Sequence, residues 1–130
     1  MSRPLRWVVA AIGCVALPAI AGDFDGSKNL ICAPVKAMDC AEGVECVEGE
    51  PQDMGAPPLL RIDFARKTVA GTHRSSPILQ TNQSEEQILL QGFDEGLGWT
   101  IAIGAGSGRM HATLAGQQGA IILQGTCTPL

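Results

Sequence analysis

Three glycines, Gly104, Gly106 and Gly108, alternate with other residues between two apolar runs, and glycine-rich loops can bind phosphate groups. A P-loop ends in Gly-Lys followed by Ser or Thr, whereas Arg109 and Met110 follow the last glycine here. A dinucleotide-binding motif runs from a strand into a helix, but the residues after Gly108 alternate between polar and apolar, as a strand does. The glycines therefore predict a hairpin of four or five residues, in which they supply positive φ angles.

Two histidines, His73 and His111, provide the imidazole groups available for acid-base chemistry. His111 falls on the polar face of an expected strand, and His73 lies in a polar loop with Ser75 and Ser76. No Gly-x-Ser-x-Gly elbow accompanies them, and no metal or cofactor motif is present in the sequence. We expect a non-enzymatic protein without a cofactor, and keep a hydrolase using His73 or His111 as the less favoured alternative.

Six carboxylates lie between positions 39 and 53 with no basic residue among them: Asp39, Glu42, Glu45, Glu48, Glu50 and Asp53. The D-x-D-x-D-G ladder of a calcium-binding loop is absent from this segment. Such a stretch is either a solvated loop or a recognition surface that attracts a cationic partner. These residues are our candidate interaction surface.

The first 21 residues have the pattern of a secretory signal peptide, with Arg3 and Arg6 before an apolar stretch and small residues ending at Ala21. The apolar run is shorter than the roughly 20 residues of a membrane span. We expect cleavage after Ala21, a single mature domain over residues 22–130, no stable membrane span, and a periplasmic or secreted location. Lipid attachment at Cys14 is the alternative to this processing.

The expected mature chain has seven basic and thirteen acidic residues. Proteins that bind nucleic acid draw most of their affinity from lysine and arginine that neutralise phosphates. The excess of acidic residues therefore disfavours nucleic acid as a partner and favours a cationic protein of the envelope or the secreted fraction.

Four cysteines remain in the mature chain, and an even number in an exported domain predicts two disulfide bonds. Three pairings are open; we favour Cys40 with Cys46, and Cys32 with Cys127. Zinc is the competing explanation, but its ligands usually come as C-x2-4-C pairs, and the spacings here are longer.

Glycine and proline divide the mature chain into short runs with a period of two, which is typical of half-buried strands. The expected strands cover residues 29–38, 59–65, 67–71, 77–81, 86–92, 98–104, 109–115 and 119–125. We also expect a turn of helix near Asp39 to Val47 and an irregular segment over residues 41–58. The predicted fold is all-β: one small antiparallel barrel or sandwich of about seven to eight strands.

The segments FDGSKNLICAPV, LRIDFARKTV, ILLQGFDEGLGWTIAI, GRMHATLAG and GTCTPL, with the pair Cys40 and Cys46, together resemble a family of small exported proteobacterial proteins of unknown function. The resemblance covers nearly the whole mature chain and implies a secreted, all-β, cysteine-containing domain. It implies no catalytic residues. A looser likeness, of fold and compartment, is to the periplasmic inhibitors of C-type lysozyme.

The absence of catalytic motifs and the acidic segment favour a binding or interaction module of the bacterial envelope. The second hypothesis is a carrier that holds an apolar ligand inside the barrel. The interior residues expected to surround such a ligand are Ile62, Phe64, Leu90, Trp99, Ile101 and Met110.

Overall fold

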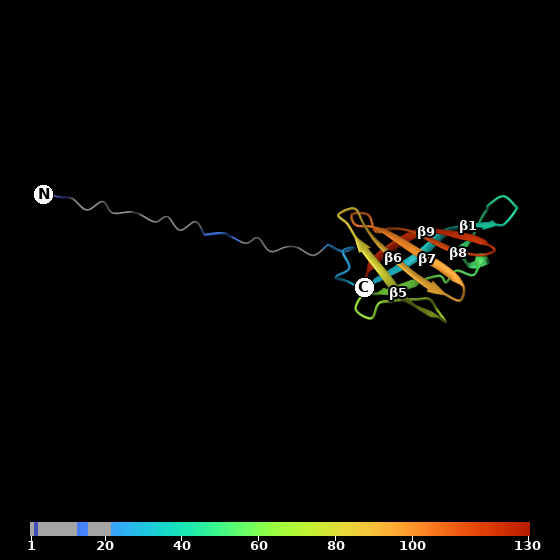
Figure 1. Ribbon diagram of the computed structural model, residues 1–130, viewed down its shortest axis with the longest axis horizontal. Coiled ribbons are helices and arrows are strands. Elements are labelled where there is room, and N and C mark those ends of the chain that lie inside the picture. The colour runs from blue at the N-terminus through green and yellow to red at the C-terminus, as the bar shows by residue number, and fades with distance from the viewer. Residues whose placement is uncertain (1, 3–12, 16–21) are drawn as a thin grey trace.

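The computed structural model describes residues 2, 13–15 and 22–130. Within this part the chain forms nine strands and one short 3-10 helix (Figure 1). Their bounds are β1 (Leu30–Ala41), β2 (Val47–Gly49), η1 (Pro51–Met54), β3 (Leu60–Asp63), β4 (Thr68–Ala70), β5 (Ser75–Gln83), β6 (Gln87–Asp94), β7 (Leu97–Gly104), β8 (Arg109–Gly116) and β9 (Gly119–Pro129).

The strands form a closed barrel, because β1 pairs with β3 along one edge and with β9 along the other. From β3 to β9 every strand pairs with the next one in the sequence, and all of these pairs are antiparallel. Eight strands close the barrel, and β2 adds to β1 as an extra strand. The all-β antiparallel fold is confirmed, in its barrel form.

Alternation of side chains determines which face of each strand is buried. Trp99, Ile101 and Ile103 of β7 are buried, and so are Met110 and Ala112 of β8, as their spacing predicts. The glycine-rich stretch connects these two strands through residues 105–108. The expected hairpin is therefore confirmed. Of its three glycines only Gly108 has a positive φ, so the role expected for the glycines is wrong for Gly104 and Gly106.

Strand β1 contains a bulge in its pairing with β9. The register with β9 shifts between Pro34 and Lys36, and the extra residue, Val35, is 64% exposed. A bulge bends its strand and changes which residues face inward, so Cys32 and Ala37 both lie in the core. The first part of β1 pairs with β3 and its last part pairs with β2.

The expected helical turn near Asp39 to Val47 is wrong. Strand β1 continues to Ala41, and the chain then returns through a tight turn with Gly43 at φ 77° into β2. Because β1 pairs with β9 as far as Ala41, the backbone N–H and C=O groups of this segment form their hydrogen bonds in the sheet and not in a helix. The segment 41–58 is likewise less irregular than expected, since it contains β2 and η1.

Two disulfide bonds join the four cysteines of residues 22–130, in the pairing that we favoured from the sequence. Cys32 and Cys127 face each other across the β1–β9 seam and form the seam disulfide, whose sulfurs lie in the core. Cys40 and Cys46 form the hairpin disulfide, which closes the loop between β1 and β2. The two bonds fasten the closure of the barrel and the hairpin that projects from it.

One end of the barrel, the closed end, is filled with side chains. The large side chains with almost no exposure in this end and the middle of the barrel are Leu30, Ile62, Ile88, Leu90, Ile103 and Met110. Phe24 lies over this end, and its Cζ is only 2.4 Å from where a Cβ on Gly108 would lie. Gly108 also has φ 66°, so both the backbone and the packing require glycine at this position.

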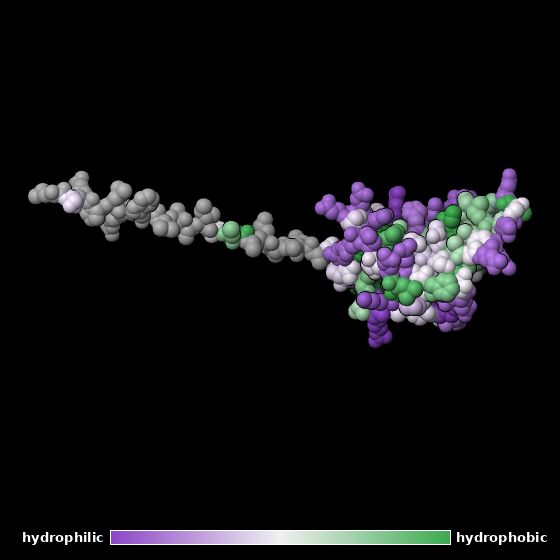
Figure 2. Space-filling view, viewed as in Figure 1, coloured by the Kyte–Doolittle hydropathy of each residue, from purple (hydrophilic) through white to green (hydrophobic). Residues whose placement is uncertain are grey.

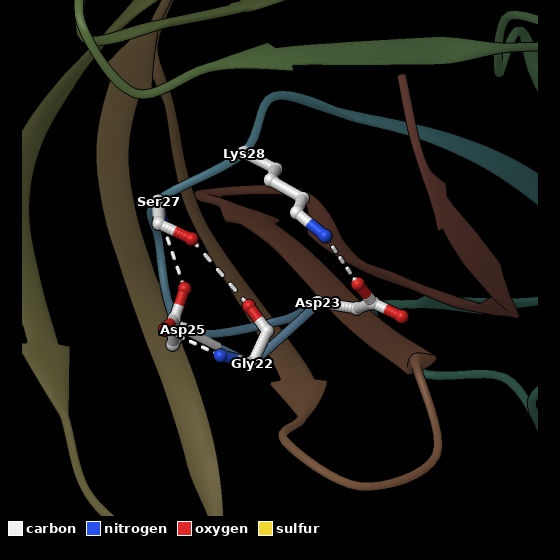
Figure 3. A network of polar contacts seen from close by, with 5 residues as sticks. All are labelled: Gly22, Asp23, Asp25, Ser27 and Lys28. Carbon is white, nitrogen blue, oxygen red and sulfur yellow. Dashed lines mark hydrogen bonds and ion pairs between the residues drawn. The ribbon is translucent and has the colours of Figure 1, made fainter. Parts of the chain in front are cut away.

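Residues 22–28, which include Phe24, form a compact turn with its own polar contacts (Figure 3). The Asp25 carboxylate accepts hydrogen bonds from the backbone N–H of Gly22 at 2.8 Å and of Ser27 at 2.9 Å. Lys28 forms an ion pair with Asp23 at 2.6 Å. In Figure 1 this turn and the C-terminus lie at the same end of the barrel.

Candidate functional site at the open end of the barrel

The opposite end of the barrel, the open end, contains a cavity of about 610 Å³ that we call the mouth cavity. This volume lies within the usual range for small-molecule sites. Apolar side chains from β3, β4, β7, β8 and β9 form its inner walls: Leu60, Val69, Trp99, Ile101, Ala112, Leu114, Ile121 and Leu123. The interior of the barrel is therefore filled at one end and hollow at the other.

Trp99 forms part of the cavity wall, and its indole is held by two features of neighbouring strands. Its Nε1–H donates a hydrogen bond of 2.8 Å to the Ser76 hydroxyl on β5, in a buried position. Gly92 on β6 leaves room for the ring, since a Cβ there would lie 2.2 Å from Trp99 Cζ2. The polar N–H is thus satisfied while the rest of the ring offers an apolar surface.

The 3-10 helix η1 and the segment after it cover the side of the cavity between β2 and β3. Pro51 occupies the first turn, where no backbone N–H is needed, and Gly55 ends the helix at φ 82°. Met54 and Ala56 pack against the core, and both line the cavity. Sequence analysis missed this element, although a proline followed four residues later by glycine is a signal for a short helix.

The rim of the cavity carries a cluster of three charged side chains. The guanidinium of Arg74 binds Asp94 through Nη2 and Glu95 through Nη1, the latter at 2.9 Å. Glu95 and Gly96 form the two-residue turn between β6 and β7, with φ of 46° and 83°. Positive φ at both positions identifies the turn as type I′, where asparagine is more usual than glutamate at the first position.

All six acidic residues of the candidate interaction surface are exposed, and they lie on or next to β1, β2 and η1. Glu48 pairs with Lys36 at 2.6 Å across the two strands. Residues 37–49 form what we call the acidic hairpin, and Val44 and Val47 are 67% and 62% exposed on it. Figure 2 shows hydrophilic and hydrophobic residues side by side where this hairpin projects from the barrel. The acidic residues and the mouth cavity share one end of the molecule.

The two histidines lie apart. His73 is exposed at the rim of the mouth cavity, whereas His111 is exposed on the outer face of β8, opposite Ala102 and Gln124. The hydroxyl of Ser76, near His73 in sequence, is occupied by Trp99. Among the described residues no three of His, Cys, Asp and Glu are grouped as metal ligands would be.

Only two of the six residues expected to surround an interior ligand, Trp99 and Ile101, line the mouth cavity. The expectation is wrong for Ile62, Leu90 and Met110, which are fully buried and do not line the cavity. Phe64 is half-buried and lies outside the cavity as well. Periodicity identifies inward residues but does not say at which end of the barrel each one lies. In a barrel whose consecutive strands run up and down, the position of a residue along its strand indicates the end of the barrel at which it lies.

Most of the expected signal peptide, residues 1–21, and its cleavage site lie outside the described residues. Cys14 is described, and its thiol is exposed and outside any disulfide. In the part of the chain that the structure describes, no helix has both the length and the apolar character needed to cross a membrane.

The fold and the site define a class: small antiparallel β-barrels that are closed by a disulfide across the seam and hollow at one end. Comparisons with protein-family models, curated proteins and solved structures found no match for this chain. The resemblance to exported bacterial proteins therefore stays a prediction, and the case for function depends on the site itself.

Proposed function

We propose that this protein is a non-enzymatic, periplasmic or secreted binding protein that holds a small apolar ligand in the mouth cavity. One observation carries the proposal: a cavity of about 610 Å³ with apolar inner walls at the open end of the barrel. The two disulfides support the location, because such bonds persist in oxidising compartments. Sequence alone favoured an interaction module, and the cavity moves our preference to the carrier.

The walls suit an apolar ligand because the buried polar group next to them is already satisfied. The indole N–H of Trp99 is bonded to Ser76, so a ligand that contacts the ring leaves no donor without a partner. Removing the apolar surface of the ligand and of the walls from water supplies the driving force, at about 25 cal/mol for each Å².

Titration with N-phenyl-1-naphthylamine, a neutral apolar fluorophore, tests the proposal on residues 22–130. Trp99 is the only tryptophan in this part of the chain, so a ligand in the cavity quenches its emission by energy transfer. We expect saturable quenching with one site per chain. Tryptophan emission that stays unchanged with this fluorophore would refute the proposal.

A matched pair of variants on β8 locates the site. Ala112 is 3% exposed and lines the cavity, so Ala112→Phe fills it and is expected to weaken binding at least tenfold. Thr113, its neighbour, points outward, so Thr113→Phe is expected to retain binding. Equal affinities of both variants would place the fluorophore outside the cavity and contradict the proposal.

The second candidate function is an interaction module that binds a cationic protein through the acidic hairpin. The observation in its favour is the exposure of Val44 and Val47 among carboxylates on a hairpin fixed by its own disulfide. C-type lysozyme is a convenient cationic probe. Binding that weakens as salt is raised, and that Glu42→Gln with Glu45→Gln reduces, would support this function, whereas no binding at low salt would remove it.

A further inference from the structure

We propose that the ligand of the mouth cavity is a cationic amphiphile, with an apolar body in the cavity and an ammonium group at the rim. This inference rests on the proposed function, since it concerns the chemical class of the same ligand. The observation behind it is the set of charged side chains at the rim. The cavity accepts the apolar end of a ligand, and these charges determine which sign of charge is favoured on its polar end.

The rim cluster favours a positive group over a negative one. Arg74 is bound by two carboxylates, so its charge is already neutralised, and the cluster keeps one net negative charge. Glu95 is 73% exposed at this point, so its carboxylate is open to a cationic head group. An anionic head group would instead approach Asp94 and Glu95 and be repelled by them.

The wider distribution of charge reinforces this selection. Eight of the thirteen acidic residues of positions 22–130 lie at the open end, with only two of the seven basic residues. The acidic ones are Asp39, Glu42, Glu45, Glu48, Glu50, Asp53, Asp94 and Glu95, and the basic ones are Lys36 and Arg74. The rest of the domain has five residues of each sign, so the net charge of the domain is concentrated at its open end.

Such an asymmetric charge acts on a ligand before contact. A surface of one sign raises the local concentration of oppositely charged molecules and their association rate. At physiological ionic strength this attraction reaches about 8 Å, which covers the rim and the approach to it. Cationic amphiphiles are therefore attracted to the opening, and the apolar walls then retain them.

Three ligands with the same tail and different heads test the inference: decyltrimethylammonium, 1-decanol and decanoate. Each competes with N-phenyl-1-naphthylamine for residues 22–130 at pH 7, below its micelle concentration. One elementary charge next to a carboxylate in water corresponds to about a fivefold change in affinity. We expect the cation to bind about five times more tightly than decanol, and decanoate more weakly than decanol.

The outcomes separate this inference from the proposed function. If none of the three displaces the fluorophore and the fluorophore itself does not bind, the proposed function fails. If all three bind equally, or decanoate binds best, the cavity is a binding site but the inference about the head group is wrong. The advantage of the cation over decanol is also expected to shrink as salt rises from 20 to 500 mM; a constant advantage would overturn the inference without any variant.

Neutral variants identify the carboxylates responsible. Asp94→Asn with Glu95→Gln removes both partners of Arg74 and changes the charge of the rim cluster from minus one to plus one, so we expect the preference to reverse and decanoate to bind more tightly than the cation. The control, Glu85→Gln with Glu86→Gln, removes the same charge at the closed end, between β5 and β6, and is expected to keep the preference. A preference that survives in the first variant, or that the control reduces as much, overturns the role of the rim.

Discussion

The fit of Trp99 against Gly92 gives a quantitative prediction for Gly92→Ala. The new methyl group would lie 2.2 Å from Trp99 Cζ2 and 2.6 Å from the backbone oxygen of Pro77. Carbon atoms in contact are normally about 3.5 to 4.0 Å apart, so the ring must retreat by more than about 1 Å. The backbone oxygen cannot move as freely as a side chain, and the strain therefore falls mainly on the indole.

Two costs add in this variant. Overpacking of a core typically costs about 1 to 3 kcal/mol, and displacement of the ring breaks the bond from Trp99 to Ser76, which contributes about 1 kcal/mol. We expect the free energy of unfolding to fall by about 2 to 4 kcal/mol. For a domain of roughly 110 residues this lowers Tm by about 9 to 17 °C.

Urea unfolding followed by circular dichroism measures the change, and the emission maximum of Trp99 reports the position of its ring. Gly106→Ala is the matched control, because a Cβ there meets nothing within 4 Å. We expect the control to change stability by less than about 0.5 kcal/mol. A loss below about 1 kcal/mol for Gly92→Ala, with an unshifted emission maximum, would refute the argument that glycine is needed to seat the ring.

Three further predictions concern other parts of the barrel. Replacing both Cys32 and Cys127 by alanine is expected to lower the free energy of unfolding in urea by about 4 to 5 kcal/mol, and replacing both Cys40 and Cys46 by about 2 kcal/mol. The difference arises because the seam disulfide closes a much longer loop than the hairpin disulfide. Equal losses would contradict this prediction. Hydrogen bonds from the Ser27 side chain and backbone lower the pKa of the Asp25 carboxyl below its usual 3.8. The ionised carboxylate therefore stabilises the 22–28 turn above about pH 4, and this stabilisation is lost as the pH falls below that value. NMR amide shifts of the turn that stay constant from pH 5 to pH 2 would argue against this prediction. Glu95→Asn is expected to raise the free energy of unfolding by about 0.5 kcal/mol, because asparagine tolerates positive φ better than glutamate. A lower Tm in calorimetry would contradict this and show that the lost ion pair with Arg74 outweighs the relief of backbone strain.

Much of the fold was predictable because each strand has one buried and one exposed face. The period of two in β7 and β8 assigns Trp99, Ile101, Met110 and Ala112 to the interior without any knowledge of their partners. The hairpin between these strands was predictable for a similar reason. Glycines between two alternating runs indicate a turn whatever lies around it.

The mouth cavity was not predictable in this way, because it depends on contacts between distant strands. Whether space remains beside Ala112 is decided by the side chains of β7 and β9 at the same level. The rim cluster has the same origin: Arg74 and Asp94 are 20 positions apart and meet because β5 and β6 are paired. The helical turn near Asp39 was mispredicted because pairing with β9 outweighs local preference.

The seam of the barrel has a consequence for the order of folding. Strands β5 to β9 form successive hairpins, whose partners are close in sequence, whereas the seam joins residues 95 positions apart. Contacts between near neighbours form faster than those between distant segments. The walls that β7, β8 and β9 give to the cavity are therefore expected to assemble first, and the first strand to dock last. Oxidation of the two thiols is then expected to follow the docking, so that the seam disulfide forms in a finished barrel.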